Sequence, residues 1–294
     1  MFSEAFLRSL RGLRLDTVRR RPGTLTGERR SPRRGRSLEF ADYRNYAPGD
    51  DPRRVDWNVY ARLERPYIKL FEDEQDLTVY VLLDDSPSMF WQMDDTSAPA
   101  QKWRCAAQLA ASLAYVALAS GDQVVIETGG GQRFGPRRGL ASAAGMLAFL
   151  ERLPPQQRPA RLALNIWLKR VAQQARSGWC AIISDCLDEA GGEEGLTALA
   201  GRGLELHLLH VLSPDELEPR FVGDLRLRDV ETEAFQDLSI DAASMQAYQR
   251  QLEAWRMGLA AAVRARGGRY RLVNSAEPIE QIVLRDLRGA GWLV

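Results

Sequence analysis

Length, composition and charge exclude several classes of protein. The chain has 294 residues, 45% hydrophobic and 27% charged, which is typical of a globular protein with a substantial core. Three cysteines and two histidines without metal-binding spacing argue against a disulfide scaffold or a classical zinc site. The longest apolar run, residues 105–119, is too short to span a bilayer. No signal-peptide core is recognisable near the N-terminus, so we expect a cytoplasmic protein without membrane insertion.

The net charge of +1 conceals an arginine-rich segment near the N-terminus. Residues 19–36 are rich in Arg, Gly and Pro and follow a short amphipathic helix that we expect over residues 4–15. This segment is either a solvated, irregular surface or a basic patch for nucleic acid or an acidic partner. Because no aromatic side chains alternate with the arginines to stack on bases, we expect no nucleic-acid partner.

Residues 35–74 combine tyrosines and tryptophan with many charged side chains. Tyr and Trp bury a large area and keep a polar group, so this composition favours an aromatic and ion-pair layer against a larger domain. Within it, PGDD indicates a turn and YIKLFEDE alternates like an edge strand. We therefore expect residues 1–75 to form an extension packed on the main domain.

From residue 77 onward, apolar strands alternate with helices. The expected strands cover residues 77–84, 122–128, 132–134, 179–185, 204–211 and 270–273, and the expected helices residues 102–120, 140–153, 162–176, 196–202, 242–266 and 278–287. This alternation predicts an α/β fold with a doubly wound, mostly parallel sheet and helices on both faces. We expect residues 76–294 to form this domain, with a small β-hairpin inserted near residues 213–240.

The stretch LTVYVLLDDSPSM, residues 77–89, reads as the central strand of this sheet. Its apolar run suits a strand buried on both faces, and its end supplies Asp84, Ser86 and Ser88. Ligands of open α/β sheets bind at the carboxyl ends of the strands, where the strand WCAIISD also ends, in Asp185. Carboxylate and hydroxyl oxygens suit Mg²⁺. These four residues are therefore the candidate metal site.

Plainer interpretations exist for the same residues. Ser86 and Ser88 are also suited to cap the loop and helix that follow, and Asp185 to be no more than an acid at a strand end. His207 and His210 lie three apart on an expected strand and point to opposite faces, so we interpret both as structural.

These motifs together carry a family resemblance. The D-x-S-x-S sequence with a later strand ending in Asp resembles the metal-ion-dependent adhesion site of von Willebrand factor A domains. The upstream sequence EFADYRNYAPGDDPRRVDWNVYAR resembles the signature of the bacterial domain-of-unknown-function family 58, whose members carry such a domain. GDLRLRDVETE, further on, is also similar to that family. The resemblance extends from about Leu15 to the C-terminus.

The resemblance implies a fold of the von Willebrand factor A type and a metal site made by three loops. Asp84, Ser86 and Ser88 would belong to the first loop, a Thr to the second and Asp185 to the third. The stretch where the Thr is expected, residues 159–162, contains none, and its Arg161 is able to pair with Asp84 or Asp185 in the metal's place. Two alternatives follow: a site that binds Mg²⁺ as its cofactor although its second loop is degenerate, and a site that keeps its shape without a metal.

Two functions are compatible with this site. The first is a non-enzymatic interaction module that accepts an acidic side chain of a partner. The resemblance implies that this partner is a MoxR-type AAA+ ATPase, for which residues 19–36 would be a second docking surface. The alternative is a Mg²⁺-dependent, phosphatase-like hydrolase using the edge made by Asp84 and Asp185.

The hydrolase has weaker support in the sequence. Phosphatases of the haloacid-dehalogenase type have a second Asp where this chain has Ser86. The sequence GGGQRFG lacks the lysine of a phosphate-binding loop, and no Ser, His and acid trio can be placed. We therefore expect a protein that is not an enzyme.

Overall fold

The structure is a computed structural model that forms two compact units, Met1–Arg21 with Leu77–Val294, and Pro22–Asp76. It describes residues 2–17, 39–47, 50, 55–72, 77–91, 101–153, 163–188, 191–221, 223–229 and 234–294.

The smaller unit is built on a two-stranded antiparallel sheet. Strand β1 (Glu39–Asn45) pairs with β2 (Tyr67–Glu72), and α2 (Trp57–Leu63) lies between them in the chain. Helix α2 begins where the Asp56 carboxylate accepts a hydrogen bond from the amide of Asn58 at 2.9 Å. Its Trp57 and Tyr60 are exposed and pack edge to face. Docking of these aromatic residues on the main domain stays a prediction.

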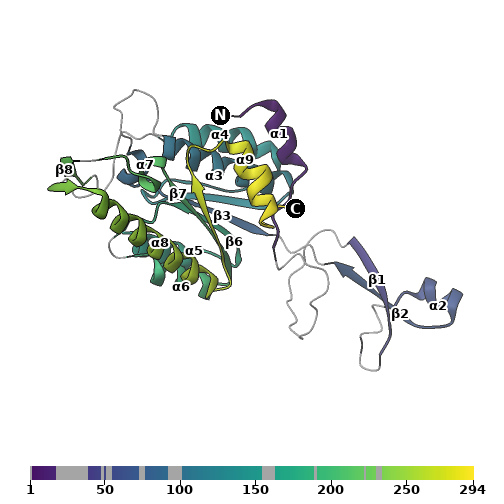
Figure 1. Cartoon of the computed structure of the whole chain (residues 1–294). Helices are drawn as coiled ribbons and strands as arrows, with labels where there is room; N and C mark the ends of the chain where they lie inside the picture. The colour runs from purple at the N-terminus through teal and green to yellow at the C-terminus, as the bar shows by residue number, and fades with distance from the viewer. Residues whose placement is uncertain are drawn as a thin grey trace. The chain divides into compact units, whose positions relative to one another are not determined.

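The main unit contains a six-stranded sheet in the order β10-β7-β6-β3-β4-β5 (Figure 1). Its strands are β3 (Thr78–Leu83), β4 (Gln123–Thr128), β5 (Arg133–Arg138), β6 (Gly178–Ser184), β7 (Leu204–Leu212) and β10 (Arg269–Asn274). All neighbouring strands are parallel except β4 and β5. Strand β3 is central and completely buried, as the sequence predicts. The order reverses at β3, so the ends of β3 and β6 lie at the topological switch point.

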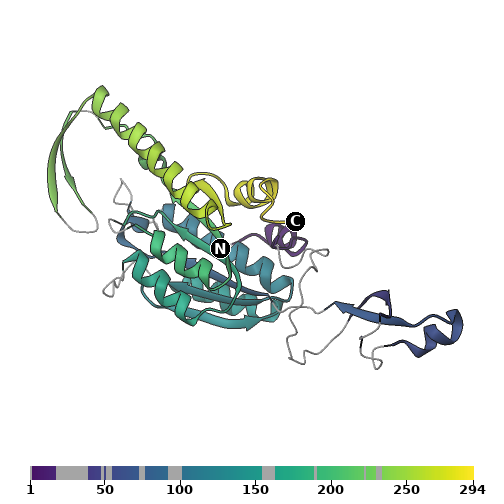
Figure 2. The same ribbon diagram turned by 90° about the horizontal axis from the view of Figure 1, so that it is seen from below.

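Helices cover both faces of the sheet (Figures 1 and 2). Successive side chains of β3 point to opposite faces, and both sets are buried. Val79, Val81 and Leu83 pack with α1 (Glu4–Arg11), α3 (Gln101–Ala119), α4 (Ala143–Glu151) and the C-terminal α9 (Ile279–Gln281) and η5 (Ile282–Leu287). Tyr80 and Leu82 pack with α5 (Leu164–Gln174), α6 (Glu193–Gly201) and Val263 of α8 (Ala242–Arg264). The predicted α/β fold, with a doubly wound, mostly parallel sheet and helices on both faces, is confirmed.

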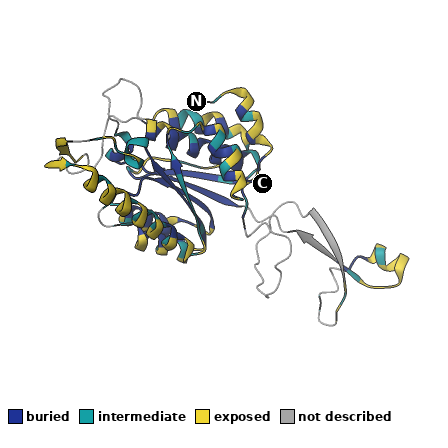
Figure 3. Cartoon of the chain, viewed as in Figure 1, coloured by how far each residue is buried: buried dark blue, intermediate teal, exposed yellow. Residues whose placement is uncertain are grey.

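Burial follows from these layers (Figure 3). The inner strands β3, β4, β6 and β7 and the inward faces of the helices are buried, while the outer faces of the helices and the edge strand β5 are more exposed. Helix α3 is the most enclosed, and its Ala-rich surface lets neighbouring elements approach closely. None of the helices in the described part of the chain has the length and hydropathy that crossing a bilayer requires.

The first seventeen residues differ from the expected arrangement because they belong to the main unit. Phe6 and Leu10 of α1 are buried in the main core, and Arg11 donates a hydrogen bond to the Tyr115 hydroxyl of α3 at 2.9 Å. Leu15 then forms an antiparallel bridge with Leu293, near the C-terminus. These contacts make the N-terminal helix part of the main unit.

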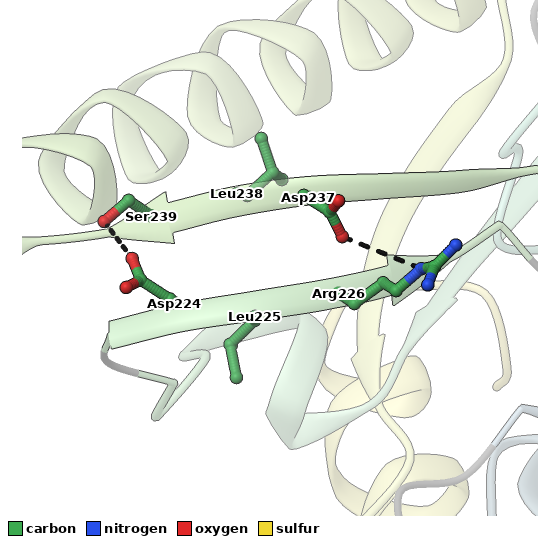
Figure 4. A pocket seen from close by; sticks show the side chains of 6 residues that line it. All are labelled: Asp224, Leu225, Arg226, Asp237, Leu238 and Ser239. Atoms are coloured by element: carbon green, nitrogen blue, oxygen red, sulfur yellow. Dashed lines mark hydrogen bonds and ion pairs between the residues drawn. The ribbon is translucent and has the colours of Figure 1, made fainter.

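The predicted hairpin insertion is present between β7 and α8. Strands β8 (Gly223–Arg228) and β9 (Phe235–Ile240) form a separate antiparallel sheet at the N-terminal end of α8 (Figure 2). Polar pairs cross the ribbon beside a surface pocket (Figure 4). Ser239 donates to Asp224 at 2.6 Å, and Arg226 lies 3.7 Å from Asp237. The segment before β8 is not part of the ribbon, because residues 214–217 form the one-turn helix α7 (Pro214–Leu217).

Gly178, the first residue of β6, provides a test of the close packing between β3 and β6. A Cβ atom at this position would lie 2.1 Å from the Thr78 carbonyl oxygen of β3. We expect Gly178→Ala to lower the free energy of unfolding by about 3 kcal/mol, as overpacking does. The matched control is Gly201→Ala at the end of α6, where a Cβ meets no atom within 4 Å. Urea unfolding of both variants checks this, and equal stabilities would contradict it.

Candidate functional site

The carboxylate of Asp84 is fixed at the end of β3 by hydrogen bonds from the protein. One oxygen, Oδ1, accepts from the Ser86 amide at 2.9 Å, and the other, Oδ2, accepts from the Ser184 hydroxyl at 2.5 Å. The backbone amide of Asp84 also donates to the Ile183 carbonyl of β6 at 2.9 Å. Asp84 is only 1% exposed. These contacts orient the side chain towards β6 and shield it from solvent.

Ser86 and Ser88 form the second part of the predicted site. Their hydroxyl oxygens lie 3.0 Å apart and share a hydrogen bond, and both residues are buried. Ser86 precedes the short helix η3 (Pro87–Phe90), but its side chain makes no capping hydrogen bond. The pair thus lines the buried loop after β3, next to Asp84 in the chain.

Asp185 follows β6 directly and is fully buried. Because Ser184, the preceding residue, bonds to Asp84, the two acidic strand ends lie at the same edge of the sheet. Oδ1 of Asp185 accepts a hydrogen bond from the Leu187 amide at 3.2 Å. Its other oxygen, Oδ2, accepts one from the ammonium of Lys102 at 2.9 Å. The four residues that the sequence singles out are therefore gathered at the switch point.

Lys102 is a residue of this site that the sequence interpretation missed. It is the second residue of α3, and its side chain is fully buried. Besides Asp185, its Nζ contacts Oε1 of Glu216 at 2.5 Å. Burial alone lowers the pKa of the Lys102 ammonium, but the negative charges of Asp185 and Glu216 outweigh it, so the pKa is raised. Lys102 is therefore a buried cation.

Glu216 reaches Lys102 from α7. The helix begins with a capping box, in which the Glu216 carboxylate accepts from the Ser213 amide at 2.7 Å and the Ser213 hydroxyl accepts from the Glu216 amide at 3.3 Å. This local structure fixes the direction of the Glu216 side chain. Three segments distant in sequence, namely α3, the end of β6 and α7, thus meet through one ammonium group.

The described residues of this site do not fit a divalent metal ion as they are arranged. The ammonium of Lys102 donates a hydrogen bond to one carboxylate oxygen of Asp185. Both carboxylate oxygens of Asp84 already accept hydrogen bonds, from the Ser86 amide and the Ser184 hydroxyl. Over the residues that the structure describes, no group of three or more His, Cys, Asp or Glu side chains is arranged to hold a metal. Residues 159–162, including Arg161, lie outside the described residues. Among the described residues, the cation beside Asp185 is the ammonium of Lys102.

His210 supports the backbone of this site. Its Nε2 lies 2.9 Å from the Asp185 carbonyl oxygen, and its Nδ1 lies 2.8 Å from the Tyr270 hydroxyl. Because a carbonyl only accepts, Nε2 carries the proton and Nδ1 accepts from Tyr270. Burial lowers the pKa of His210 to about 4. The neutral imidazole therefore positions the loop that carries Asp185.

His207 lies on the other face of β7, as the alternation of a strand requires. Its ring stacks on Trp179 at a centroid distance of 4.2 Å and meets the edge of Trp292 at 5.1 Å. Neither ring nitrogen has a hydrogen-bond partner among the described residues. Burial lowers the pKa of His207 to about 3. This histidine belongs to the core and not to the site.

Several known proteins are similar to this chain. The uncharacterized proteins Rv1480 of Mycobacterium tuberculosis and Mb1516 of Mycobacterium bovis are each 29% identical over 263 residues, which cover 88% of this chain and 81% of theirs.

Among solved structures, the conserved hypothetical protein BatB of Bacteroides thetaiotaomicron is 15% identical. That match covers 72% of this chain and 98% of BatB, with a TM-score of 0.41. A von Willebrand factor type A protein of Catenulispora acidiphila is 13% identical over 76% of this chain and 43% of its own, also with a TM-score of 0.41.

The family assignment agrees with the motifs in the sequence. Residues 42–257 match the family described as protein of unknown function DUF58. The match includes most of the upstream aromatic signature, the strand that precedes Asp84, Asp185 and the hairpin. The chain therefore belongs to the DUF58 family.

Proposed function

We propose that the protein is a non-enzymatic protein-interaction module of the cytoplasm, acting as an adaptor or co-chaperone of a MoxR-type AAA+ ATPase. The observation that carries this proposal is the closed polar network at the switch point. Asp84, Asp185 and Lys102 are buried, Asp185 pairs with Lys102, and Asp84 accepts a hydrogen bond from Ser184, the residue before Asp185. Such an edge holds its charged groups in one arrangement, which suits selective recognition of a partner's polar side chain.

The same network weakens the alternative, a Mg²⁺-dependent hydrolase. A carboxylate nucleophile or metal ligand has to reach the substrate or the ion. Both oxygens of Asp84 accept hydrogen bonds from the protein, and Asp185 is paired with Lys102. The binding function requires no such rearrangement of Asp84.

The ATPase is proposed as the partner on the family resemblance. An acidic side chain of that partner would engage the edge through its oxygens, with the serines and the buried cation as the recognition elements. The arginine-rich residues 19–36, which lie outside the described residues, are proposed as a second docking surface for acidic regions of the ATPase.

Affinity purification from the native cell tests this function. Tagged wild-type protein should recover an AAA+ ATPase, identified by mass spectrometry. Ser86→Ala should reduce the recovery roughly fivefold, since a lost hydrogen bond contributes about 1 kcal/mol. Ser142→Ala is the matched control, because that hydroxyl is exposed and bonds only locally, to the Arg138 carbonyl. Circular dichroism should show that both variants are folded.

A phosphoesterase panel separates the two functions. Purified wild-type protein with Mg²⁺ should not hydrolyse phosphate esters above the background of Asp84→Asn, which keeps the shape of the side chain. Phosphate ester hydrolysis that depends on Asp84, together with no recovered ATPase, would contradict the interaction module and support the hydrolase.

A further inference from the structure

The buried ammonium of Lys102 requires an explanation beyond packing. Lysine side chains usually extend their charged ends to water, because an enclosed ammonium loses its hydration. Here the side chain begins at the second residue of α3 and ends between the carboxylates of Asp185 and Glu216, with no exposed surface. Its charge compensates two acids that would otherwise repel each other at the edge of the sheet.

A divalent ion and this ammonium exclude each other. A metal bound by Asp185 would lie within a few ångströms of Lys102 Nζ, which itself is 2.9 Å from Asp185 Oδ2. At such separations like charges repel by several kcal/mol even at a moderate effective dielectric constant, of about 20. Metal binding would therefore require Lys102 to leave a fully enclosed position.

Glu216 is the most exposed member of this cluster. Its side chain is 16% exposed, whereas those of Lys102 and Asp185 are 0% exposed. It is carried by α7, a helix of four residues, while the other two extend from α3 and the central sheet. Displacing one turn of helix disturbs far fewer contacts than displacing a core element.

We propose that the Lys102 ammonium is the resident cation of this edge in place of a divalent metal, and that Glu216 is its internal ligand, which a partner's carboxylate replaces. This inference rests on the proposed function and specifies its chemistry, because an Asp or Glu side chain of the partner would bind where Glu216 now lies. The acidic ligand then pairs with lysine and not with Mg²⁺.

Magnesium titration tests the first half of the proposal. The melting temperature of the wild-type protein should be the same in Mg²⁺ and in EDTA. In Lys102→Ala the two facing carboxylates lose their counter-charge, so Mg²⁺ should raise the melting temperature. The double variant Lys102→Ala/Asp185→Asn should not respond. Mg²⁺ stabilisation of the wild type, or no response of Lys102→Ala, would overturn the assignment.

A second measurement does not depend on the folding of the lysine variant. Mn²⁺ added to wild-type protein should keep the electron paramagnetic resonance spectrum of the free ion. Bound Mn²⁺ that is lost in Asp84→Asn would show that the wild-type edge holds a metal.

Chemical rescue tests the exchange of Glu216. Glu216→Ala leaves Lys102 without one of its two carboxylates, and sodium acetate should raise the melting temperature of this variant above that in sodium chloride of equal ionic strength. The wild type and Lys102→Met/Glu216→Ala should show no such difference. No acetate effect in Glu216→Ala would overturn the exchange, whether or not an ATPase is recovered. If acetate stabilises Glu216→Ala but no ATPase is recovered in the affinity purification, the ATPase partnership is contradicted. The proposed carboxylate site at Lys102 is then still supported.

Discussion

Lys102→Met should lower the free energy of unfolding by about 3–5 kcal/mol, the usual effect of removing one partner of a buried ion pair. Methionine preserves most of the side-chain volume, so the loss comes from the charge. Without the ammonium, Asp185 and Glu216 face each other at a site where Asp185 is inaccessible to water. Urea denaturation at neutral pH, followed by tryptophan fluorescence, measures the change.

Two further variants separate charge from packing at Lys102. Lys102→Met/Asp185→Asn/Glu216→Gln removes the whole charge cluster and should recover a large part of the lost stability, because no buried charge remains unpaired. Lys169→Met should have little effect, because Lys169 pairs with Glu194 on the exposed surface. A loss below about 1 kcal/mol in Lys102→Met would mean that the ammonium is solvated in the folded protein.

Acid should destabilise the protein through its two buried histidines. The pKa of His207 is about 3 and that of His210 about 4 in the folded chain, both lowered first of all by burial, against 6.5 as the ordinary value. Below pH 6.5 the unfolded chain therefore binds more protons than the folded one. The free energy of unfolding consequently decreases as the pH is lowered, until the pKa values of the folded chain are reached. Each histidine should contribute a loss of about 1.4 kcal/mol per pH unit in that window.

The variant His207→Phe isolates one of these contributions. Phenylalanine keeps the aromatic contacts with Trp179 and Trp292 and removes two ring nitrogens that have no partner among the described residues. Between pH 6.5 and 4.5 the variant should lose about 1.4 kcal/mol less per pH unit than the wild type. Urea unfolding of the two proteins is compared at several pH values. Because both proteins have the same carboxylates, the contribution of these groups drops out of the difference in free energy of unfolding. Parallel stability profiles would contradict the low pKa of His207.

Much of the fold could be predicted because its signals are local. The apolar run before Asp84 is typical of a strand buried on both faces, and β3 is completely buried. The parallel arrangement then requires Asp84 and Asp185 to lie at one edge, which the hydrogen bond between Asp84 and Ser184 illustrates. The opposite faces of His207 and His210 likewise follow from the alternation of a strand.

The cation of the site could not be predicted because its contacts are distant in sequence. Lys102 lies 83 residues from Asp185 and 114 from Glu216. At the start of an Ala-rich helix, a lysine is usually a solvated residue, and only the fold shows that this end is enclosed. Glu216 was expected in a hairpin, whereas the sequence SPDE, residues 213–216, forms a capping box and α7. The hairpin starts only at Gly223.

A hydrogen bond between α7 and α8 connects Glu216 to α8, in addition to its ion pair with α3. Its carboxylate pairs with Lys102, while its carbonyl oxygen accepts from the Tyr248 hydroxyl of α8 at 2.7 Å. Helix α8 is about 35 Å long at 1.5 Å per residue, and it connects the hairpin to β10. A displacement of α7 thus strains or breaks its tie to α8. By thermodynamic reciprocity, a ligand that shifts α8 through this bond would alter carboxylate affinity at Lys102 as much as the carboxylate alters the affinity of that ligand.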